Sequence, residues 1–194
     1  MPVTSTMARG RLPVRLDKPR VAPLADDQLD PELRARFGSG PILNIFRTLA
    51  NHPALAKRWL VFGNHILAKN TLPAREREIA ILRIGWLCRS GYEWGQHVVI
   101  GKASGLSDEE IACITQGSDA PGWSADDRAL LRATDELHED AFVTDATWAE
   151  LSKGWNTQQL MDLVFTVGQY NLVSMALNTL GVQPEPGLPA LPRG

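Results

Sequence analysis

The sequence has few of the residues that thiol redox chemistry, disulfide scaffolds and membrane anchors require. Only two cysteines, Cys88 and Cys113, occur among the 194 residues, and they lie 25 positions apart rather than in a C-x-x-C pair. This spacing argues against a dithiol redox centre and against a disulfide framework. The longest apolar run covers about five residues, Ile84 to Cys88, where a membrane helix needs ~20. We therefore expect no membrane partner.

An excess of charge of one sign is also missing. Twenty Lys and Arg residues oppose 22 Asp and Glu residues, which leaves a formal net charge of −2. A chain so close to neutrality is not expected to bind nucleic acid by neutralising phosphates. The composition, 44% hydrophobic and 22% charged, is that of an ordinary globular domain. The chain is long enough to bury a core without disulfide or metal support.

The two ends of the chain differ from its middle. Residues 1–20 carry five basic residues against one acidic residue, and Pro2, Pro13 and Pro19 interrupt any helix there. Residues 183–194 hold four prolines, so this tail is expected to run extended over a surface. We expect a basic arm over 1–20, one domain over 21–182 and the tail over 183–194. No signal-peptide core follows the arm, so a cytoplasmic location is expected.

Helix-start signals recur along the middle of the chain. Asp30 precedes Pro31, which predicts a capped helix with proline at its first position. Ser107 and Glu110 form a capping box, and Ser124 heads a weaker version of the same pattern. Further helix starts are indicated at Pro53, Pro73, Thr144 and Thr157, and Gly181 ends the last helix. No alternating run with hairpin turn residues appears. The sequence therefore predicts an all-α domain of about seven or eight helices.

One segment carries a pattern suited to acid–base chemistry. Glu93 and His97 stand at i and i+4, so their side chains share one face of a helix. A carboxylate beside an imidazole favours the imidazolium and orients the ring, which makes a general acid or base near neutral pH. Glu78 lies one predicted helix earlier. The break at Ser90-Gly91 would let the two helices fold back, so that Glu78 approaches the pair.

Other side chains of this region suggest a pocket. Tyr92 and Trp94 flank the pair with apolar surface and one hydroxyl, as a small flat ligand requires. Arg83 could bind a substrate carboxylate bidentately, or form an ion pair with a neighbouring acid. Cys88 lies in an apolar stretch and is interpreted as a small core residue rather than a nucleophile.

Two other interpretations of the same residues stay open. A Glu–His pair at i and i+4 is also common on a solvated helix face, which would fit a non-enzymatic scaffold or binding protein. Alternatively, Glu78, Glu93 and His97 could hold a metal ion in a metal-dependent enzyme. The three remaining histidines stand in other segments without ligand spacing, and transition metals prefer several nitrogen or sulfur ligands, so we expect no metal.

The sequence resembles the carboxymuconolactone decarboxylase family, which also contains the AhpD-type alkylhydroperoxidases. The resemblance covers most of the chain, from about Arg20 to Val182. It is carried by four stretches, namely Asn44-Ile-Phe-Arg-Thr-Leu-Ala50, Leu72-Pro-Ala-Arg-Glu-Arg-Glu78, Tyr92-Glu-Trp-Gly-Gln-His97 and Val167-Gly-Gln-Tyr170.

The peroxidase branch of that family departs from this chain at its reactive thiols. That branch has a glutamate, a C-x-x-C pair that starts twelve residues later, and a histidine four residues after the second cysteine. On this chain the frame places the glutamate at Glu78 and the histidine at His97, but the cysteine positions hold Ser90 and Glu93. Peroxide reduction needs a thiolate and a resolving thiol, so peroxidase activity is not expected.

The resemblance implies a cofactor-independent enzyme of decarboxylase, isomerase or lyase type. It implies an AhpD-like helical fold that assembles as homotrimers or hexamers, with sites near subunit contacts. His97 would be the main acid–base group, oriented by Glu93, while Glu78 stabilises the imidazolium or relays protons. Gln169 and Tyr170, on the last helix, would contact a small aromatic-derived carbonyl, lactone or ring-cleavage compound.

Overall fold

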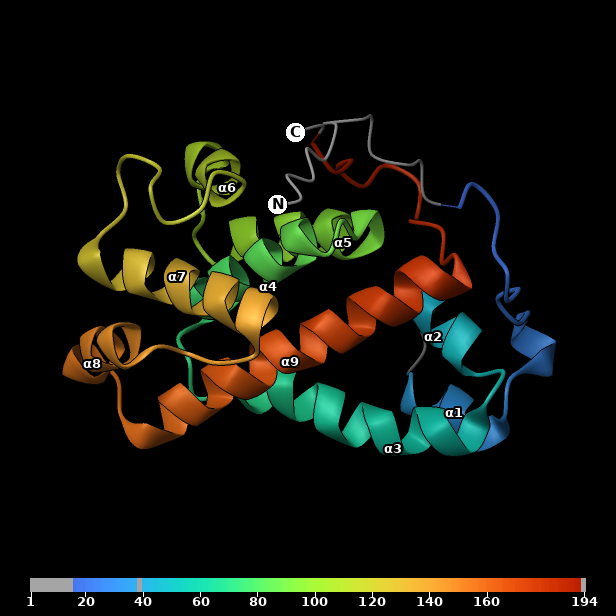
Figure 1. Ribbon diagram of the computed structural model, residues 1–194. Helices are drawn as coiled ribbons and strands as arrows, with labels where there is room; N and C mark the ends of the chain where they lie inside the picture. Colours follow the sequence, from blue (N-terminus) through green and yellow to red (C-terminus); the bar gives the residue numbers. More distant parts are fainter. Residues whose placement is uncertain (1–15, 38–39, 193–194) are drawn as a thin grey trace, which may run out of the picture.

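The computed structural model describes residues 16–37 and 40–192, and within them it contains only helices and connecting loops (Figure 1). The all-α prediction is confirmed, although the described residues form nine α-helices rather than seven or eight. The elements in chain order are the 3-10 turn η1 (Asp26–Gln28), α1 (Pro31–Arg36), α2 (Asn44–Leu49), α3 (Pro53–Asn64), the π-helical segment η2 (His65–Lys69), α4 (Ala74–Leu87), α5 (Gly91–Ala103), α6 (Asp108–Ile114), α7 (Ala125–Asp140), α8 (Asp145–Gly154) and α9 (Thr157–Leu180).

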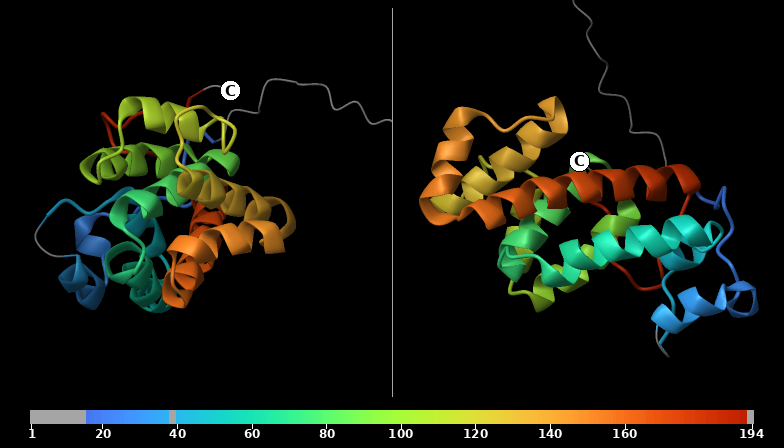
Figure 2. Two further views of the ribbon diagram at one scale, coloured as in Figure 1. Left: turned by 90° about the vertical axis from the view of Figure 1, so that its left-hand side faces the viewer. Right: turned by 90° about the horizontal axis from the view of Figure 1, so that it is seen from below.

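Helix α4 is the centre of the molecule. It packs against α5, α7 and α9, and every residue from Glu78 to Gly85 is buried. Because its neighbours cover it on all sides, α4 carries an apolar run rather than a narrow apolar stripe. The long helix α9 crosses α4, and α1 to α3 gather at one end with a smaller core of their own (Figures 1 and 2). A polar side chain on α4 is therefore buried unless a pocket reaches it.

Most of the predicted helix starts are found where the sequence placed them. The side chains of Asp30, Ser107, Ser124 and Thr144 each accept a hydrogen bond from the backbone N–H three residues later. Thr157, which was predicted to cap the last helix, is instead the first residue of α9, and Asn156 is its cap.

Helix α2 had no start signal in the sequence. It has only six residues, and its N-cap, Leu43, makes no side-chain hydrogen bond. Such a short helix is held by tertiary packing rather than by its own helix propensity. The local sequence pattern therefore did not predict it.

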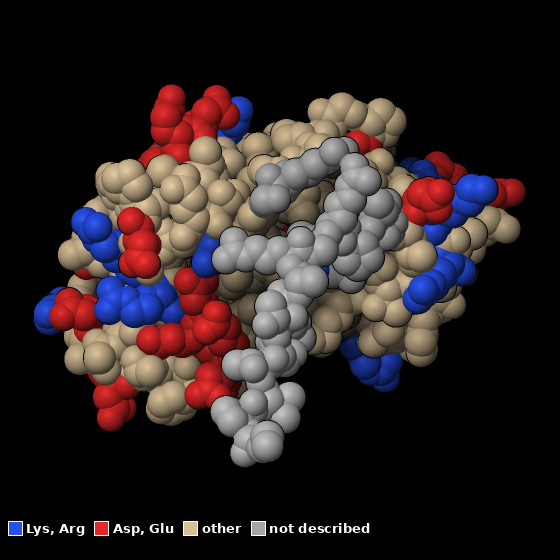
Figure 3. Space-filling model, turned by 45° about the horizontal axis from the view of Figure 1, so that its top comes forward, with Lys and Arg blue, Asp and Glu red and all other residues tan. Residues whose placement is uncertain are grey.

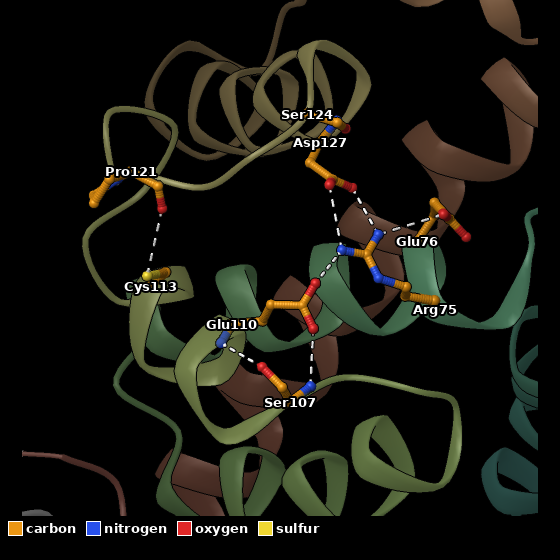
Figure 4. A network of polar contacts seen from close by, with 8 residues as sticks. All are labelled: Arg75, Glu76, Ser107, Glu110, Cys113, Pro121, Ser124 and Asp127. Atoms are coloured by element: carbon orange, nitrogen blue, oxygen red, sulfur yellow. Dashed lines mark hydrogen bonds and ion pairs between the residues drawn. The ribbon is translucent and has the colours of Figure 1, made fainter.

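A cluster of charged side chains fixes the N-terminal end of α4 to two other helices (Figure 4). The Arg75 guanidinium donates to Asp127 of α7 at 2.8 Å and to Glu110 of α6. Glu110 also accepts from the Ser107 N–H, so the capping box of α6 and the ion pairs share one carboxylate. On the face shown in Figure 3, acidic and basic side chains are interspersed, in keeping with the small net charge.

The C-terminal segment lies against α5. A Cβ atom on Gly95 of α5 would stand 3.0 Å from the Pro189 carbonyl oxygen and 3.1 Å from Leu188 Cβ, so glycine is what lets the tail approach this helix. Most of the predicted N-terminal arm, residues 1–15, lies outside the described residues. At its end, the Arg20 N–H donates to the Leu180 carbonyl at 2.9 Å, next to the end of α9.

Candidate acid–base site

Helices α4 and α5 form a tight hairpin that brings Glu78 to His97. The chain reverses over Cys88–Ser90, where Arg89 adopts a left-handed conformation with φ of 53°. His97 Nδ1 lies 2.6 Å from Glu78 Oε2, and His97 Nε2 lies 2.9 Å from Glu93 Oε1. The three side chains that the sequence placed together are thus brought together, with the imidazole between two carboxylates.

All three members of this cluster are buried. The side chains of His97 and Glu93 are 6% exposed, and that of Glu78 is 0% exposed. Burial by itself lowers the pKa of His97, but the hydrogen bonds that the ring donates to Glu78 and Glu93 outweigh burial and raise the pKa to about 9. At neutral pH the ring is therefore an imidazolium that donates a hydrogen bond to each carboxylate.

The two carboxylates differ in what else they contact. Glu78 is fully engaged, because its Oε1 accepts a hydrogen bond from Arg77 Nε at 3.3 Å while its Oε2 holds His97. Glu93 uses Oε1 for His97, and its Oε2 forms no hydrogen bond with any residue that the structure describes. Glu93 is therefore the carboxylate that can accept a further hydrogen bond, through its Oε2 atom.

A pocket of about 230 Å³ opens beside this cluster. Glu93 and His97 line it, whereas Glu78 lies behind them. The neutral polar groups on the wall come from three helices, α3, α5 and α9. They are Asn64, Tyr92, Gln96, Gln169 and Tyr170. The rest of the wall is apolar and comes mainly from α2, α3 and the segments next to them.

Tyr170 packs its ring against the imidazole. The two ring centroids lie 4.9 Å apart with an interplanar angle of 85°, an edge-to-face contact. Burial and the nearby charges of Glu93 and Glu78 raise the pKa of the Tyr170 hydroxyl well above its ordinary value. The hydroxyl thus stays protonated and can donate to a molecule in the pocket.

Two of the sequence-predicted binding residues lie elsewhere. Trp94 is 2% exposed and packs on Trp86 with ring centroids 5.9 Å apart, so it belongs to the core and not to the pocket wall. Arg83 donates to both carboxylate oxygens of Asp135, at 2.6 and 3.0 Å, and to the carbonyl of Ile114. Of the two interpretations of Arg83, the ion pair with a neighbouring acid is the one observed.

The sequence also missed part of the wall. Tyr92 was predicted to bind the substrate and lines the pocket, but its hydroxyl donates a hydrogen bond to Glu185 of the tail at 3.0 Å. Gln96 was not predicted, and its Nε2 donates to the same carboxylate at 2.6 Å. Burial and Glu185 raise the pKa of the Tyr92 hydroxyl. Trp59 and Asn64 of α3 were not anticipated either. Of these missed residues, only Gln96 had a local signal in the sequence, because it lies in the stretch from Tyr92 to His97 that resembles the family.

The geometry does not suit a single metal ion. The two ring nitrogens of His97 point to opposite sides, and each is occupied by a different carboxylate, so the three groups do not converge on one point. Among the residues that the structure describes, no group of three or more His, Cys, Asp or Glu side chains is arranged to hold a metal.

Several solved structures share this fold. A peroxidase-related protein from Ralstonia eutropha JMP134 is 18% identical, with a TM-score of 0.74 over 86% of this chain and 93% of that one. One from Silicibacter sp. TM1040 is 17% identical, with a TM-score of 0.73 over 93% and 96%. The debrominase Bmp8, as a variant in complex with 2,3,4-tribromopyrrole, is 16% identical, with a TM-score of 0.69 over 86% and 91%.

These identities establish the fold alone, and no curated protein matches the chain significantly. The sequence itself adds a family match, because residues 53–136 fit the profile of the carboxymuconolactone decarboxylase family. This segment contains all three members of the buried cluster, together with the Ser90 and Glu93 positions that lack cysteine. Residues 53–136 are therefore similar to the carboxymuconolactone decarboxylase family, and the solved structures show that the chain has the AhpD-like fold.

Proposed function

We propose that this protein is a cofactor-independent acid–base enzyme of decarboxylase, isomerase or lyase type. Its substrate would be a small aromatic-derived carbonyl, lactone or ring-cleavage compound. The observation that carries this proposal is a pocket-lining carboxylate, Glu93, which binds a buried imidazolium through Oε1 and whose Oε2 forms no hydrogen bond with any described residue. The match of residues 53–136 to the family favours an enzymatic role but does not specify this reaction.

In this mechanism Glu93 is the group that exchanges a proton with the substrate. Both nitrogens of His97 face carboxylates, so a proton from the ring reaches the pocket through Glu93. In a decarboxylation, loss of CO₂ leaves an enolate, whose carbon takes a proton that passes from His97 Nε2 through Glu93. In an isomerisation, Glu93 removes a proton from one carbon and returns it to another. A well-placed proton transfer of this kind contributes on the order of 10² to 10⁴ in rate.

Behind Glu93, the other members of the cluster hold the imidazolium in place. Glu78 accepts from His97 Nδ1 and is itself held by Arg77, so the ring cannot turn its nitrogens away from the two carboxylates. The protonated Tyr170 hydroxyl can stabilise negative charge on a substrate oxygen as an enolate forms. Gln169 and Gln96 supply neutral hydrogen-bonding groups on the same wall.

The charges of the pocket favour an uncharged substrate. Glu93 and His97 are its only ionised lining groups among the described residues, and they neutralise each other. Within residues 16–37 and 40–192, no arginine or lysine lines it, so a substrate with two carboxylates would find no cation from this part of the chain. A second, wholly apolar cavity of about 110 Å³ shares Ile45, Trp59 and Val173 with the pocket. Together the two reach the ~300 Å³ at which ligand sites begin.

Proton exchange tests this proposal before the natural substrate is known. Unsaturated lactones, cyclic ketones and β-keto acids would be incubated in D₂O with the wild type, E93Q and E78Q, with NMR detection of deuterium at carbon and of CO₂ release. We expect the wild type to exchange deuterium into a neutral lactone or ketone, or to release CO₂ from a β-keto acid with a single carboxylate, with a loss of about 10²-fold or more in E93Q. E78Q should lose less, because Glu78 does not line the pocket.

The surface variant E150Q, whose carboxylate pairs only with Lys153 in the described residues, controls for handling and should match the wild type. An effect of E93Q under about tenfold would remove Glu93 from the chemistry. Turnover of a γ-carboxylated lactone alone, with none of a neutral analogue, would contradict the substrate class. No exchange with any compound, despite ligand binding in the pocket, would favour a binding protein instead.

A further inference from the structure

The apolar cavity beside the pocket has a lining suited to a ligand group of its own. It measures about 110 Å³, and no polar surface faces it. Among the residues that the structure describes, Thr48 is the only polar one on its wall. Water in such a space finds too few hydrogen-bond partners, so the cavity accepts an apolar group in preference to water. No residue that lines only this cavity takes part in the proposed chemistry.

Helix α9 lines the pocket with one stretch and the apolar cavity with the next. Gln169 and Tyr170 face the pocket, Val173 lines both spaces, and Ala176 and Leu177 line the cavity alone. At 1.5 Å per residue, position 176 lies about 9 Å further along the helix than position 170. The two spaces therefore follow one another along α9.

Helix α3 shows the same order in the opposite chain direction. Asn64 lines the pocket, Trp59 lines both spaces, and Leu55 lines the cavity alone. The two helices lie side by side, and the rings of Phe62 and Phe165 meet edge-to-face between them with centroids 6.1 Å apart (Figure 2). The pocket and the cavity are thus two chambers in series along the α3–α9 pair.

The boundary between the chambers is apolar. Ile45, Trp59 and Val173 line both, and they come from three different helices. The Trp59 ring lies over Gly63, where a Cβ atom would stand 3.6 Å from it. The Ile45 N–H donates to the Tyr92 hydroxyl at 3.3 Å, which holds the α2 side of the boundary in place. A ligand that occupies both chambers therefore needs no polar group where it passes from one to the other.

The volumes set the size of each part of such a ligand. An apolar protein cavity of about 150 Å³ stays dry and binds benzene, which has six carbon atoms. In the same proportion, the apolar cavity of about 110 Å³ suits about four carbon atoms. The pocket of about 230 Å³ is by itself smaller than the ~300 Å³ at which ligand sites begin. Both chambers are needed to reach that size.

We propose that the substrate has two parts, a neutral polar head beside Glu93 and Tyr170 and an uncharged apolar substituent of about four carbons in the apolar cavity. A charged substituent would lose its hydration there without gaining a partner. This inference rests on the proposed function in taking the pocket beside Glu93 as the substrate site. It does not depend on which proton transfer takes place there.

The test is a chain-length series measured by binding to the full chain. The probes are neutral butenolides and cyclohexenones that carry unbranched alkyl chains of zero to eight carbons, and isothermal titration calorimetry gives their dissociation constants. In the wild type, affinity should rise about three- to fourfold for each added methylene, because each one leaves water for an apolar wall. The rise should level off at about four carbons, where the cavity is full.

Substitutions at Ala176 fill the cavity without touching the pocket wall. In A176F the ring takes the place of the chain, so all members of the series should bind alike and the butyl compounds should lose about 100-fold in affinity. A176L adds three carbons and should move the levelling-off point to about one carbon. M175F places the same ring on a residue that is 59% exposed and lines neither chamber, so it should match the wild type. Circular dichroism checks that the variants are folded.

Three results would overturn the proposal. They are an affinity that does not change with chain length, a chain-length dependence that is the same in A176F and M175F, and failure of every butyl compound to bind. The first is also expected if a side chain of another protein fills the cavity. The reaction is judged separately, because binding requires no turnover. A chain-length dependence without proton exchange would remove the proposed reaction and keep this subsite, whereas exchange on an unsubstituted lactone with a flat dependence would do the reverse.

Discussion

Two charged clusters are both built on α4, yet their central cations differ in kind. Arg75 binds Glu110 and Asp127, and its hydrogen bond to Asp127 is the main reason that its pKa rises further above an already high value. That guanidinium is charged under all ordinary conditions. His97 binds Glu78 and Glu93, and its pKa of about 9 lies within reach of solution pH. Only the second cluster can change its charge.

The two clusters also differ in exposure. The Arg75 and Glu110 side chains are 26% and 31% exposed, so water completes their solvation. The His97 and Glu93 side chains are each 6% exposed, and both lie at a pocket. The comparison teaches that an ion cluster on this fold can serve either of two purposes. A permanently charged, partly exposed cluster joins helices, whereas a buried cluster that can titrate beside a cavity is suited to proton transfer.

The largest expected difference between the clusters is in stability. H97A leaves two buried carboxylates without their shared cation, which typically costs about 3–5 kcal/mol. R75A leaves only one buried carboxylate, Asp127, without its cation, whereas Glu110 is 31% exposed and still accepts from the Ser107 N–H, so we expect a smaller loss of about 1–3 kcal/mol. Urea unfolding of the wild type and both variants at pH 7 measures the two losses. Equal losses, or a larger one in R75A, would show that the His97 cluster is not the buried, tightly coupled unit described.

A smaller effect should appear on changing the pH. Folding raises the pKa of His97 from about 6.5 to about 9, so its protonated ring stabilises the fold fully below pH 6.5. This stabilisation, on the order of 3 kcal/mol, is lost as the pH rises through 9. The difference in unfolding free energy between the wild type and H97Q should therefore shrink from pH 6 to pH 10.

The Arg75 cluster provides the control for that measurement. Its cation does not titrate in this range, so the difference between the wild type and R75A should stay constant from pH 6 to pH 10. A difference between the wild type and H97Q that is flat with pH would mean that the ring of His97 is not protonated in the folded protein at neutral pH.

The core of the site was predictable because its geometry is local. Glu93 and His97 are one turn apart on a single helix, and the break at Ser90 folds the preceding helix back so that Glu78 meets the ring. Helix starts with a side-chain cap, such as Ser107, were predictable for the same reason. Residues whose partners stand within a few positions need no knowledge of the tertiary structure.

The rest of the pocket depends on packing between segments that are distant in sequence. Trp94 follows Tyr92 by two positions, which turns it about 200° around the helix and into the core. Arg83 meets Asp135, 52 residues away, a pairing that no local spacing reveals. The α3 wall residues Trp59 and Asn64 reach the pocket because that helix packs against α1, α2 and η2.

The smallest effect concerns the tail, whose contribution to the pocket likewise had no local signal. Glu185 accepts hydrogen bonds from the Asn44 N–H at 2.7 Å, from the Tyr92 hydroxyl and from Gln96 Nε2, so one carboxylate joins the tail to α2 and α5. In E185Q the amide nitrogen cannot accept a hydrogen bond, which leaves one of these donors unpaired. We expect a loss of about 1 kcal/mol in thermal unfolding and faster proteolysis of the tail. Substrate affinity should fall a few-fold with little change in kcat, because Glu185 anchors the wall and does not touch the Glu93–His97 pair. A variant indistinguishable from E150Q would show that the tail lies on α5 without stabilising it.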